Sequence, residues 1–322
     1  MKQSGFFTVI QFFVAVIISS GTYAQVERVV LPGELRQETI VTEPPTLRKG
    51  FLRTGLAYSH AFIDKIFDEN NDKTGLGGTI SGQSRQYQVH AMYGLTDKLE
   101  LYASVPFVNV SLYQTTEYHM QNAIQVNRWS QHGKGLSDIS IGIRYLLLEE
   151  SASAPSLFVG VTSDMPTGEK NPTNIIDENN YDRPTGSGEF AFDFEMKARK
   201  VIYPWSFSIY ATHKIRTGGE KVVVPGQLPV SFKDGNYTRI TGSGYFHLND
   251  WIVLANDLGY GIRGRDMVDE ILDDYRSWTL ELTPYLFFQI RQMRLVQSVT
   301  IPLKGHVAGA DPMYILIVQI IL

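Results

Sequence analysis

The sequence predicts an all-β protein, a single 12-stranded antiparallel up-and-down transmembrane β-barrel. Three observations predict this fold class. From Gly50 onwards, apolar side chains recur at every second position, which is the period of a strand and not of a helix. The connections between these segments alternate between short and long. The chain is 43% hydrophobic and 19% charged, and its one sustained apolar run lies at the extreme N-terminus, which excludes a membrane protein built of several helices.

Composition also excludes several function classes. The chain has no cysteine, so it has no disulfide scaffold, thiolate zinc site or cysteine nucleophile. Its 28 glycines, 17 tyrosines and 17 phenylalanines favour β structure. A formal charge of -4 leaves no basic excess to neutralise a phosphate backbone, so no nucleic-acid partner is expected. No cofactor is implied.

Residues 1–24 are predicted to be a secretory signal peptide. One lysine precedes an apolar stretch at 6–18, and small residues close the segment at Ala24. The apolar stretch is too short to cross a bilayer as a helix. Gln25 and not a cysteine follows the expected cleavage point, so no acylated lipoprotein anchor is expected. A retained anchor helix is the alternative.

The remaining chain divides into two predicted parts. Residues 25–48 carry charges and three prolines without sustained periodicity, and they are predicted to be an irregular periplasmic lead-in. Residues 49–322 are predicted to form the transmembrane barrel.

Twelve segments show the alternation. The sixth is the clearest, because its aromatic residues and Met196 occupy one face and Glu189, Asp193, Glu195 and Lys197 the other. Asn256 and Asp257 interrupt opposite faces of the ninth, so the parity of residues 236–260 stays open. In chain order the segments are 52–62, 87–93, 99–107, 139–147, 157–161, 190–196, 205–209, 237–248, 251–260, 278–288, 295–303 and 314–322.

The connections supply the second signal. Five short turns and six longer loops place both termini on the short-turn side, which is the layout of an outer-membrane barrel. A soluble, exported β-sandwich is the competing fold, but aromatic residues near strand ends favour the two interfacial girdles of a barrel. The short turns are expected at 95–98, 149–155, 199–202, 249–250 and 290–292, and the loops at 63–83, 114–134, 166–186, 216–235, 262–274 and 304–311.

Four strings carry a family resemblance: RKGFLRTGLAYSHAF at 48–62, YGLTDKLELYASVPFV at 93–108, KGLSDISIGIRYLLL at 134–148 and GVTSDMPTGE at 160–169. They resemble outer-membrane proteins of the "MetA-pathway of phenol degradation" family, usually described as transporters. The resemblance covers about the first half of the mature chain. It implies an outer-membrane barrel that passes aromatic or other hydrophobic compounds, and it assigns no ligand residue. Barrels of this type often end in an aromatic residue, whereas this chain ends in Leu322.

The assigned faces direct polar side chains of mixed sign into the lumen. Opposite charges on neighbouring strands either orient a polar solute or pair and fill the interior, and tyrosines beside them suit an aromatic acid or phenol. The lumen-facing candidates for substrate binding are Tyr102, Asp138, Arg144, Asp193, Glu195, Lys197, Tyr210, Lys214, Arg239, Glu281 and Tyr285.

The expected function is that of a porin-like outer-membrane channel or transporter, which passively takes up or expels small molecules, with aromatic or hydrophobic compounds as candidates. The expected partners are outer-membrane lipid and lipopolysaccharide, the outer-membrane assembly machinery and the small-molecule solute. The alternative is a structural or accessory barrel whose lumen is plugged by the lead-in or by an infolded loop, since barrel size alone does not decide.

Enzymatic and metal sites are weaker hypotheses. An outer-membrane hydrolase would need a serine and a base within hydrogen-bond reach, for which His90 and Ser104 are the candidate pair, yet neither has a local catalytic signature. The acidic loops 68–72 and 177–182 lack the calcium-loop spacing and are expected to be solvated. Residues 267–272 have the apolar spacing for one or two helical turns over the pore mouth.

Overall fold

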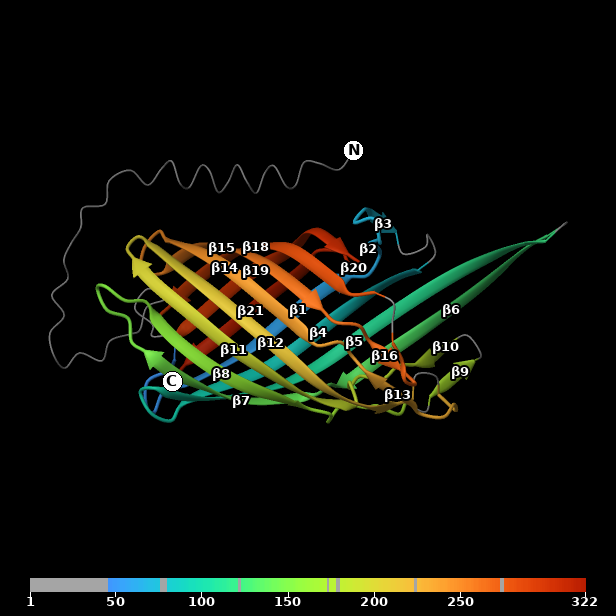
Figure 1. Ribbon diagram of the computed structural model, residues 1–322, viewed down its shortest axis with the longest axis horizontal. Helices are drawn as coiled ribbons and strands as arrows, with labels where there is room; N and C mark the ends of the chain where they lie inside the picture. The colour runs from blue at the N-terminus through green and yellow to red at the C-terminus, as the bar shows by residue number, and fades with distance from the viewer. Residues whose placement is uncertain are drawn as a thin grey trace. The chain divides into compact units, whose positions relative to one another are not determined.

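Figure 1 shows the computed structural model, which describes residues 46–75, 80–120, 123–172, 174–177, 180–222, 225–272 and 275–322. The chain divides into two units, Met1–Gln37 and Glu38–Leu322, and every described residue belongs to the second. The predicted signal peptide and most of the predicted lead-in lie outside the described residues. The described part of the chain contains no helix with the length and hydropathy needed to cross a membrane.

Twelve antiparallel strands form a closed barrel, as predicted, and each of the twelve alternating segments contributes to one of them. The barrel closes where β1 pairs with β21, from Arg53 opposite Ile321 to Ala61 opposite Met313. The barrel strands are β1 (Leu52–Phe62), β4 (Ile80–Gly94), β5 (Leu99–Met120), β7 (Ile139–Leu148), β8 (Ser156–Met165), β11 (Glu189–Ile202), β12 (Trp205–Lys221), β14 (Tyr237–His247), β15 (Ile252–Arg263), β18 (Ser277–Ile290), β19 (Met293–His306) and β21 (Met313–Ile321).

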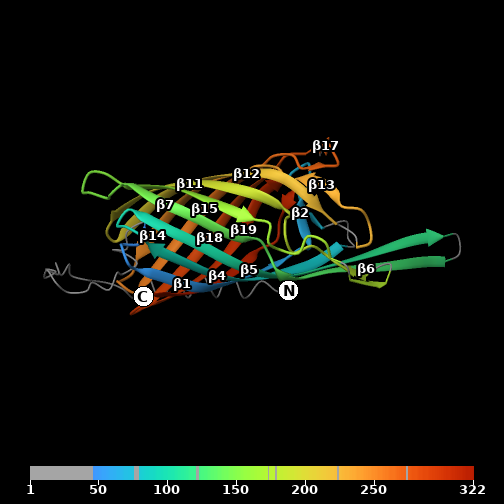
Figure 2. The same ribbon diagram turned by 90° about the horizontal axis from the view of Figure 1, so that it is seen from below.

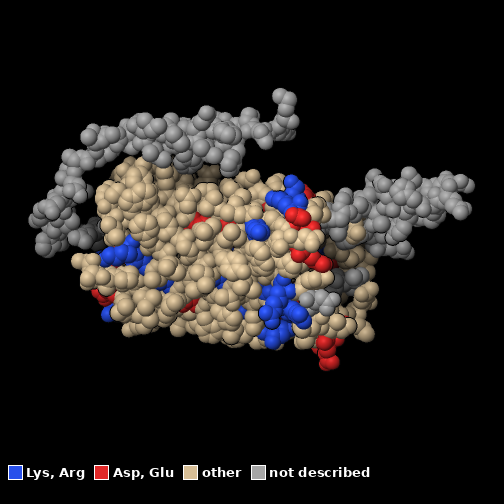
Figure 3. All heavy atoms as spheres, turned by 45° about the horizontal axis from the view of Figure 1, so that its top comes forward, with Lys and Arg blue, Asp and Glu red and all other residues tan. Residues whose placement is uncertain are grey.

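The outer face of the barrel is apolar. The predicted outward positions are exposed, for example Phe194 at 48%, Ile143 at 47% and Ile209 at 63%. On the face shown in Figure 3, acidic and basic side chains gather mainly towards the two ends, and other residues cover most of the surface between them. An apolar exterior around a closed strand array is what lipid requires, because no backbone donor or acceptor is left without a partner.

The inner face is polar. Glu100 and Ser104 on β5, together with Glu195 on β11, are buried although they carry charged or hydroxyl groups. Pairing also settles the parity that the sequence left open. On β15, Val253 and Ala255 face inwards and Asp257 lines an interior cavity, whereas Asn256 on the same strand is exposed.

One predicted loop is a hairpin. The segment 114–134 was expected to be a long loop, but β5 continues to Met120 and pairs with β6 (Ala123–Leu136) from Phe107 opposite Leu136 to Met120 opposite Ala123. The first six residues of β5, Leu99 to Ser104, pair with β7 instead, so β7 and β6 follow one another along the same edge of β5. The segment 107–132 contains no proline and no glycine, which permits an uninterrupted ladder. Figures 1 and 2 both show this hairpin reaching beyond the rest of the barrel.

The remaining long connections carry short strands. Residues 267–272, expected to form helical turns, instead form a β-hairpin with a two-residue turn. The turn residues, Asp269 and Glu270, have positive φ angles of 48° and 65°. Two positive φ angles are the requirement of the type I′ turn that matches strand twist. The short strands are β2 (Lys65–Phe67), β3 (Lys73–Gly75), β9 (Ile175–Asp177), β10 (Asn180–Asp182), β13 (Val230–Lys233), β16 (Met267–Val268), β17 (Ile271–Leu272) and β20 (Ala308–Gly309).

The outward face predicts the effect of a charge at mid-strand. In phospholipid vesicles, Phe194→Arg is expected to lower the free energy of unfolding by about 2–4 kcal/mol, because it places a cation against lipid near the bilayer midplane. Denaturant titration of refolded protein measures this value. Phe194→Leu is the matched control and keeps the face apolar. Equal stability of the two variants would contradict an outward, lipid-facing Phe194.

Candidate functional site

Described residues line a larger and a smaller cavity in the interior of the barrel. The larger, of about 470 Å³, is lined from β1, β7, β8, β11, β12, β14, β15, β18 and β19. The smaller, of about 210 Å³, is lined from β5, β7, β8, β11 and β12. Arg144, Glu195 and Tyr210 line both cavities, so the two cavities adjoin at these three side chains.

An ion-paired cluster lies where the two cavities adjoin. Arg144 donates from Nε to Oε1 of Glu195 at 2.6 Å, and its Nη1 lies 3.3 Å from Oε1 of Glu100. The Tyr210 hydroxyl donates to Oε2 of Glu195 at 2.7 Å. Both carboxylates are buried, and Arg144 also lies over the Tyr102 ring at 5.3 Å from its centroid. We call Glu100, Arg144, Glu195 and Tyr210 the Arg144 cluster.

Strand register explains why the cluster forms. The register places four residues in one row across β5, β7, β8 and β11. In this row Glu100 pairs with Arg144, Arg144 with Gly160, and Gly160 with Glu195. A Cβ atom at Gly160 would lie only 2.5 Å from Oε1 of Glu195 and 3.0 Å from Cγ of Arg144. The glycine therefore leaves the space through which Arg144 reaches a carboxylate two strands away.

A second ion pair at the large cavity also spans a strand that carries a glycine. Arg239 on β14 lies 2.9 Å from Glu281 on β18, and Gly259 on the intervening strand β15 pairs with Glu281. A Cβ atom at Gly259 would lie 2.7 Å from Nη2 of Arg239. Asp257 and Tyr285 line the same cavity, and Oδ1 of Asp257 is buried without a hydrogen-bond partner among the described residues.

The smaller cavity has a charge pair of its own. Lys214 lies 2.8 Å from Oδ2 of Asp164, whose other carboxylate oxygen accepts a hydrogen bond from Ser140 at 2.6 Å. Asp193 lines the same cavity, and its Oδ1 is buried with no hydrogen-bond partner among the described residues. The smaller cavity thus offers one cation and two carboxylates besides the Arg144 cluster.

The structure brings together most of the predicted lumen residues. Arg144, Glu195, Lys197, Tyr210, Arg239 and Tyr285 line the large cavity, and Tyr102, Asp193 and Lys214 line the small one. Glu281 contributes through its ion pair with Arg239. Asp138 differs from the expectation, because its carboxylate accepts hydrogen bonds from the backbone of Gly168 at 3.0 Å and Ser187 at 2.7 Å and thereby fastens the β8–β11 loop.

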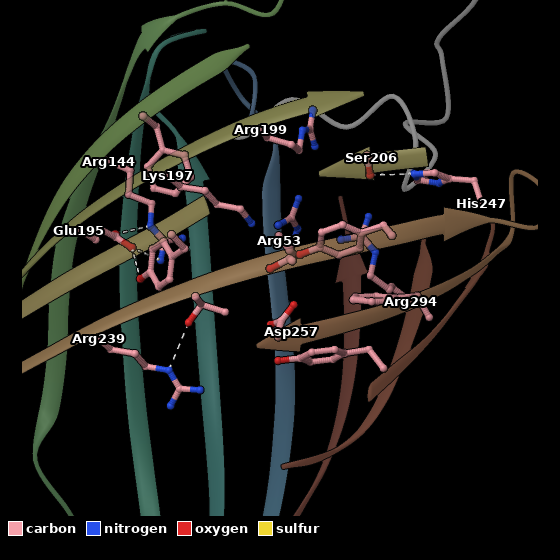
Figure 4. Close-up of a pocket in the computed structure, with 17 residues that line it drawn as sticks. Arg53, Arg144, Glu195, Lys197, Arg199, Ser206, Arg239, His247, Asp257 and Arg294 are labelled. Carbon is pink, nitrogen blue, oxygen red and sulfur yellow. Dashed lines mark hydrogen bonds and ion pairs between the residues drawn. The ribbon is translucent and has the colours of Figure 1, made fainter. Parts of the chain in front are cut away.

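Sequence reasoning missed the most basic part of the large cavity. Arg53, Arg199 and Arg294 project towards it from β1, β11 and β19, close to the short turns (Figure 4). Together with Lys197 they form what we call the basic cluster. Arg199 was assigned to a turn, and β11 in fact continues to Ile202. Lys197 has inward parity, and Arg199 lies two residues further along the same strand. Residues two apart in a strand share a face, so this spacing is the signal that would have identified Arg199.

The last residues of the lead-in, from Thr46 onwards, contact the barrel interior. The backbone amide of Leu47 donates to Oε2 of Glu100 at 2.8 Å, and both Thr46 and Leu47 are 1% exposed. The backbone amide of Lys49 donates to Asp97 in the short turn between β4 and β5. Residues 46–49 therefore lie at the short-turn end, and one of them contacts the Arg144 cluster.

The candidate hydrolase pair has a different set of contacts. His90 and Ser104 are register partners on β4 and β5, and both are buried. However, Nε2 of His90 lies 3.0 Å from the side-chain amide of Gln319. In serine catalysis, one imidazole nitrogen bonds to the serine hydroxyl and an orienting group holds the other. In His90, Nε2 already contacts Gln319.

The acidic loops lead to no metal site in the described structure. Asp68 accepts hydrogen bonds from the backbone amides of Asn70 and Asp72, each at 2.9 Å, so its carboxylate organises a turn. Within the described ranges, no group of three or more His, Asp or Glu side chains could hold a metal ion. The second acidic loop includes residues 178 and 179, which lie outside those ranges.

Comparison with solved structures identifies the fold. The crystal structure of the COG4313 outer membrane channel from Pseudomonas putida F1 matches with a TM-score of 0.66 at 15% sequence identity, over 91% of this chain and 100% of that chain. The fold is that of an outer-membrane β-barrel. The translocator domain of autotransporter NalP from Neisseria meningitidis matches with a TM-score of 0.41 at 11% identity, over 86% of this chain and 90% of that chain. The NanC porin matches with a TM-score of 0.43 at 9% identity, over 82% of this chain and 98% of that chain.

Sequence comparison adds no family assignment. No protein-family model and no curated protein sequence matches the chain. The resemblance to the MetA-pathway of phenol degradation family therefore stays a prediction. The structural likeness establishes the barrel fold of this chain.

The Arg144 cluster predicts a large stability effect. Arg144→Met is expected to lower the free energy of unfolding by about 3–5 kcal/mol, because it leaves two buried carboxylates without their cation. Denaturant titration of refolded protein measures the loss. Adding Glu100→Gln and Glu195→Gln to the same variant is the matched control, and it should restore much of the stability. A loss that is equally large in the triple variant would contradict charge isolation as the cause.

Proposed function

We propose that this protein is a passive outer-membrane channel for small molecules, with aromatic compounds among its solutes. The observation that carries the proposal is the pair of polar cavities inside an apolar barrel, which adjoin at Arg144, Glu195 and Tyr210. A lumen lined by paired charges and hydroxyl groups offers polar contacts to a solute along its way. In this proposal the solute gradient drives movement in either direction.

Localisation follows the same proposal. The N-terminal segment exports the chain as a cleaved signal peptide, and the barrel assembles in the outer membrane with the assembly machinery as a transient partner. The exposed apolar belt contacts lipid, and the long connections contact lipopolysaccharide. The likeness to the barrel from Pseudomonas putida, which is described as an outer membrane channel, supports this proposal.

Aromatic solutes are proposed on two grounds. Tyr245 and Tyr285 both lie near Phe287 in the large cavity, with ring centroids 6.2 and 5.7 Å from it. Such faces can stack on a planar ring. The resemblance of residues 48–169 to a family associated with phenol degradation points to the same class of solute.

A plugged lumen is the second candidate, and a specific observation favours it. Thr46 and Leu47 are buried at the short-turn end, and the Leu47 amide is bonded to Glu100 of the Arg144 cluster. In this alternative the lead-in closes the periplasmic mouth, and the barrel has a structural or accessory role.

Solute flux tests the proposal. Liposomes that contain the refolded mature chain are expected to take up sugars, amino acids and aromatic acids faster than empty liposomes, with a cut-off at a definite solute size. A variant lacking residues 25–45 should show the same cut-off, because the proposed path does not depend on the lead-in. Heat-modifiable migration in electrophoresis controls for correct folding in both samples.

The same experiment separates the alternatives. No flux from the folded full-length chain, but rapid flux from the shortened variant, would support a plug formed by the lead-in and contradict an open channel. No flux from either folded protein would contradict both the channel and a removable plug, and would leave a closed structural barrel.

A further inference from the structure

The large cavity has an uneven distribution of charge. Six cationic side chains and two carboxylates, Glu195 and Asp257, line it. Three of the cations also pair with carboxylates outside the lining, Arg144 with Glu100, Arg199 with Glu150 and Arg239 with Glu281. Glu195 is already engaged by Arg144 and Tyr210, whereas Asp257 has one carboxylate oxygen, Oδ1, buried without a hydrogen-bond partner among the described residues. The short-turn part of the cavity holds the basic cluster of Arg53, Lys197, Arg199 and Arg294. Such a lining favours an anion over a cation or a neutral molecule.

Individual donors in this part of the cavity lack partners. Lys197 makes no ion pair within the described part of the chain. Nε of Arg199 is buried without a hydrogen-bond acceptor among the described residues, although its guanidinium lies 3.7 Å from Glu150. Nδ1 of His247 is also buried without a partner there, and its Nε2 lies 3.0 Å from the Ser206 hydroxyl, so the ring tautomer sets which of the two nitrogens donates. Unsatisfied buried donors are costly in an isolated barrel and become satisfied when an acceptor enters.

Hydroxyl groups complete the polar lining of this region. Ser206 and Ser243 line the cavity, and Ser208 pairs in register with both Arg199 on β11 and Ser243 on β14. The Ser208 hydroxyl is buried without a partner in the described structure. Hydroxyl groups beside guanidinium groups can donate to the oxygens of a bound carboxylate.

An aromatic face lies in the same cavity. Tyr285 and Phe287 are consecutive inward residues of β18, with ring centroids 5.7 Å apart and planes inclined by 23°. Tyr245 on β14 lies against Phe287 with a centroid distance of 6.2 Å. The cavity of about 470 Å³ is within the size range of small-molecule sites. One cavity thus offers cations at the short-turn end and a ring-stacking wall beside them.

We propose that the large cavity binds a single-ring aromatic carboxylate. The carboxylate contacts the basic cluster and the serine hydroxyls, and the ring packs against Tyr245, Tyr285 and Phe287. This inference rests on the proposed channel function, because it names the class of solute that pauses in the lumen. Charge-assisted hydrogen bonds fix the charged end, and aromatic contacts select the ring.

Titration calorimetry on the refolded, detergent-solubilised protein tests the site with four probes. Benzoate carries both ring and negative charge, benzyl alcohol the ring without charge, benzylammonium the ring with the opposite charge, and acetate the charge without the ring. Benzoate is expected to bind about tenfold or more tightly than each of the others, as one charge-assisted hydrogen bond or one ring face accounts for such a ratio. Equal affinity for benzoate and benzyl alcohol would overturn the inference.

Two variants locate the bound probe. Lys197→Met should weaken benzoate binding about tenfold and leave benzyl alcohol unchanged, because it removes one charge-assisted contact. Phe287→Leu should weaken benzoate about threefold and leave acetate unchanged, because it removes a ring contact. Lys98→Met is the matched control, since Lys98 is exposed at a short turn beside Glu149 and outside the cavity. Unchanged benzoate affinity in Lys197→Met and Phe287→Leu would overturn the assignment.

Flux distinguishes this inference from the channel proposal. Liposomes that pass neutral sugars without any benzoate preference, together with absent benzoate binding, would overturn the aromatic carboxylate site and keep the channel. Specific benzoate binding without flux of any solute would keep the site and overturn the channel.

Discussion

Pairing between β1 and β21 is the constraint on which the rest of the structure depends. Each strand in a bilayer must satisfy its backbone donors and acceptors within the protein, because lipid offers none. The ladder from Arg53 opposite Ile321 to Ala61 opposite Met313 removes the last two free edges of the sheet. Once the sheet is closed, alternation along each strand has only one consistent orientation, with apolar side chains in lipid and polar side chains inside.

The interior follows from this closure. Charged groups that face a narrow lumen are held where water is limited, so they need partners. The Arg144 cluster and the pair of Arg239 with Glu281 meet this need with the same device, a glycine on the strand between cation and carboxylate. The Arg144 cluster lies where a small cavity of mixed charge adjoins a large cavity whose short-turn end is basic.

The sequence alone predicts the barrel well because the strand period, the loop alternation and the closure rule all depend on local pattern. It fails where local pattern is ambiguous. The β5–β6 hairpin lacks a strict apolar alternation over 114–134, and residues 267–272 have a helical spacing but a turn of two positive φ angles. In both places, pairing with a neighbouring strand decides the conformation.

The candidate site is only partly predictable for a related reason. Inward parity identifies Arg144, Glu195 and Lys197, because each lies in a strand with clear alternation. Which carboxylate meets Arg144 depends on the register of four strands and on the space at Gly160, neither of which the sequence shows. Arg199 and Arg294 lie beside short turns, where strand ends cannot be placed by pattern alone.

The central claim is that the polar lumen is an open path whose basic end favours anions. The zero-current potential of the refolded protein in a planar bilayer, under a potassium chloride gradient, tests it most directly. The account predicts a stable conductance and a potential whose sign shows chloride to be more permeant than potassium. A folded, inserted barrel that conducts no current, or one that prefers potassium, would contradict it.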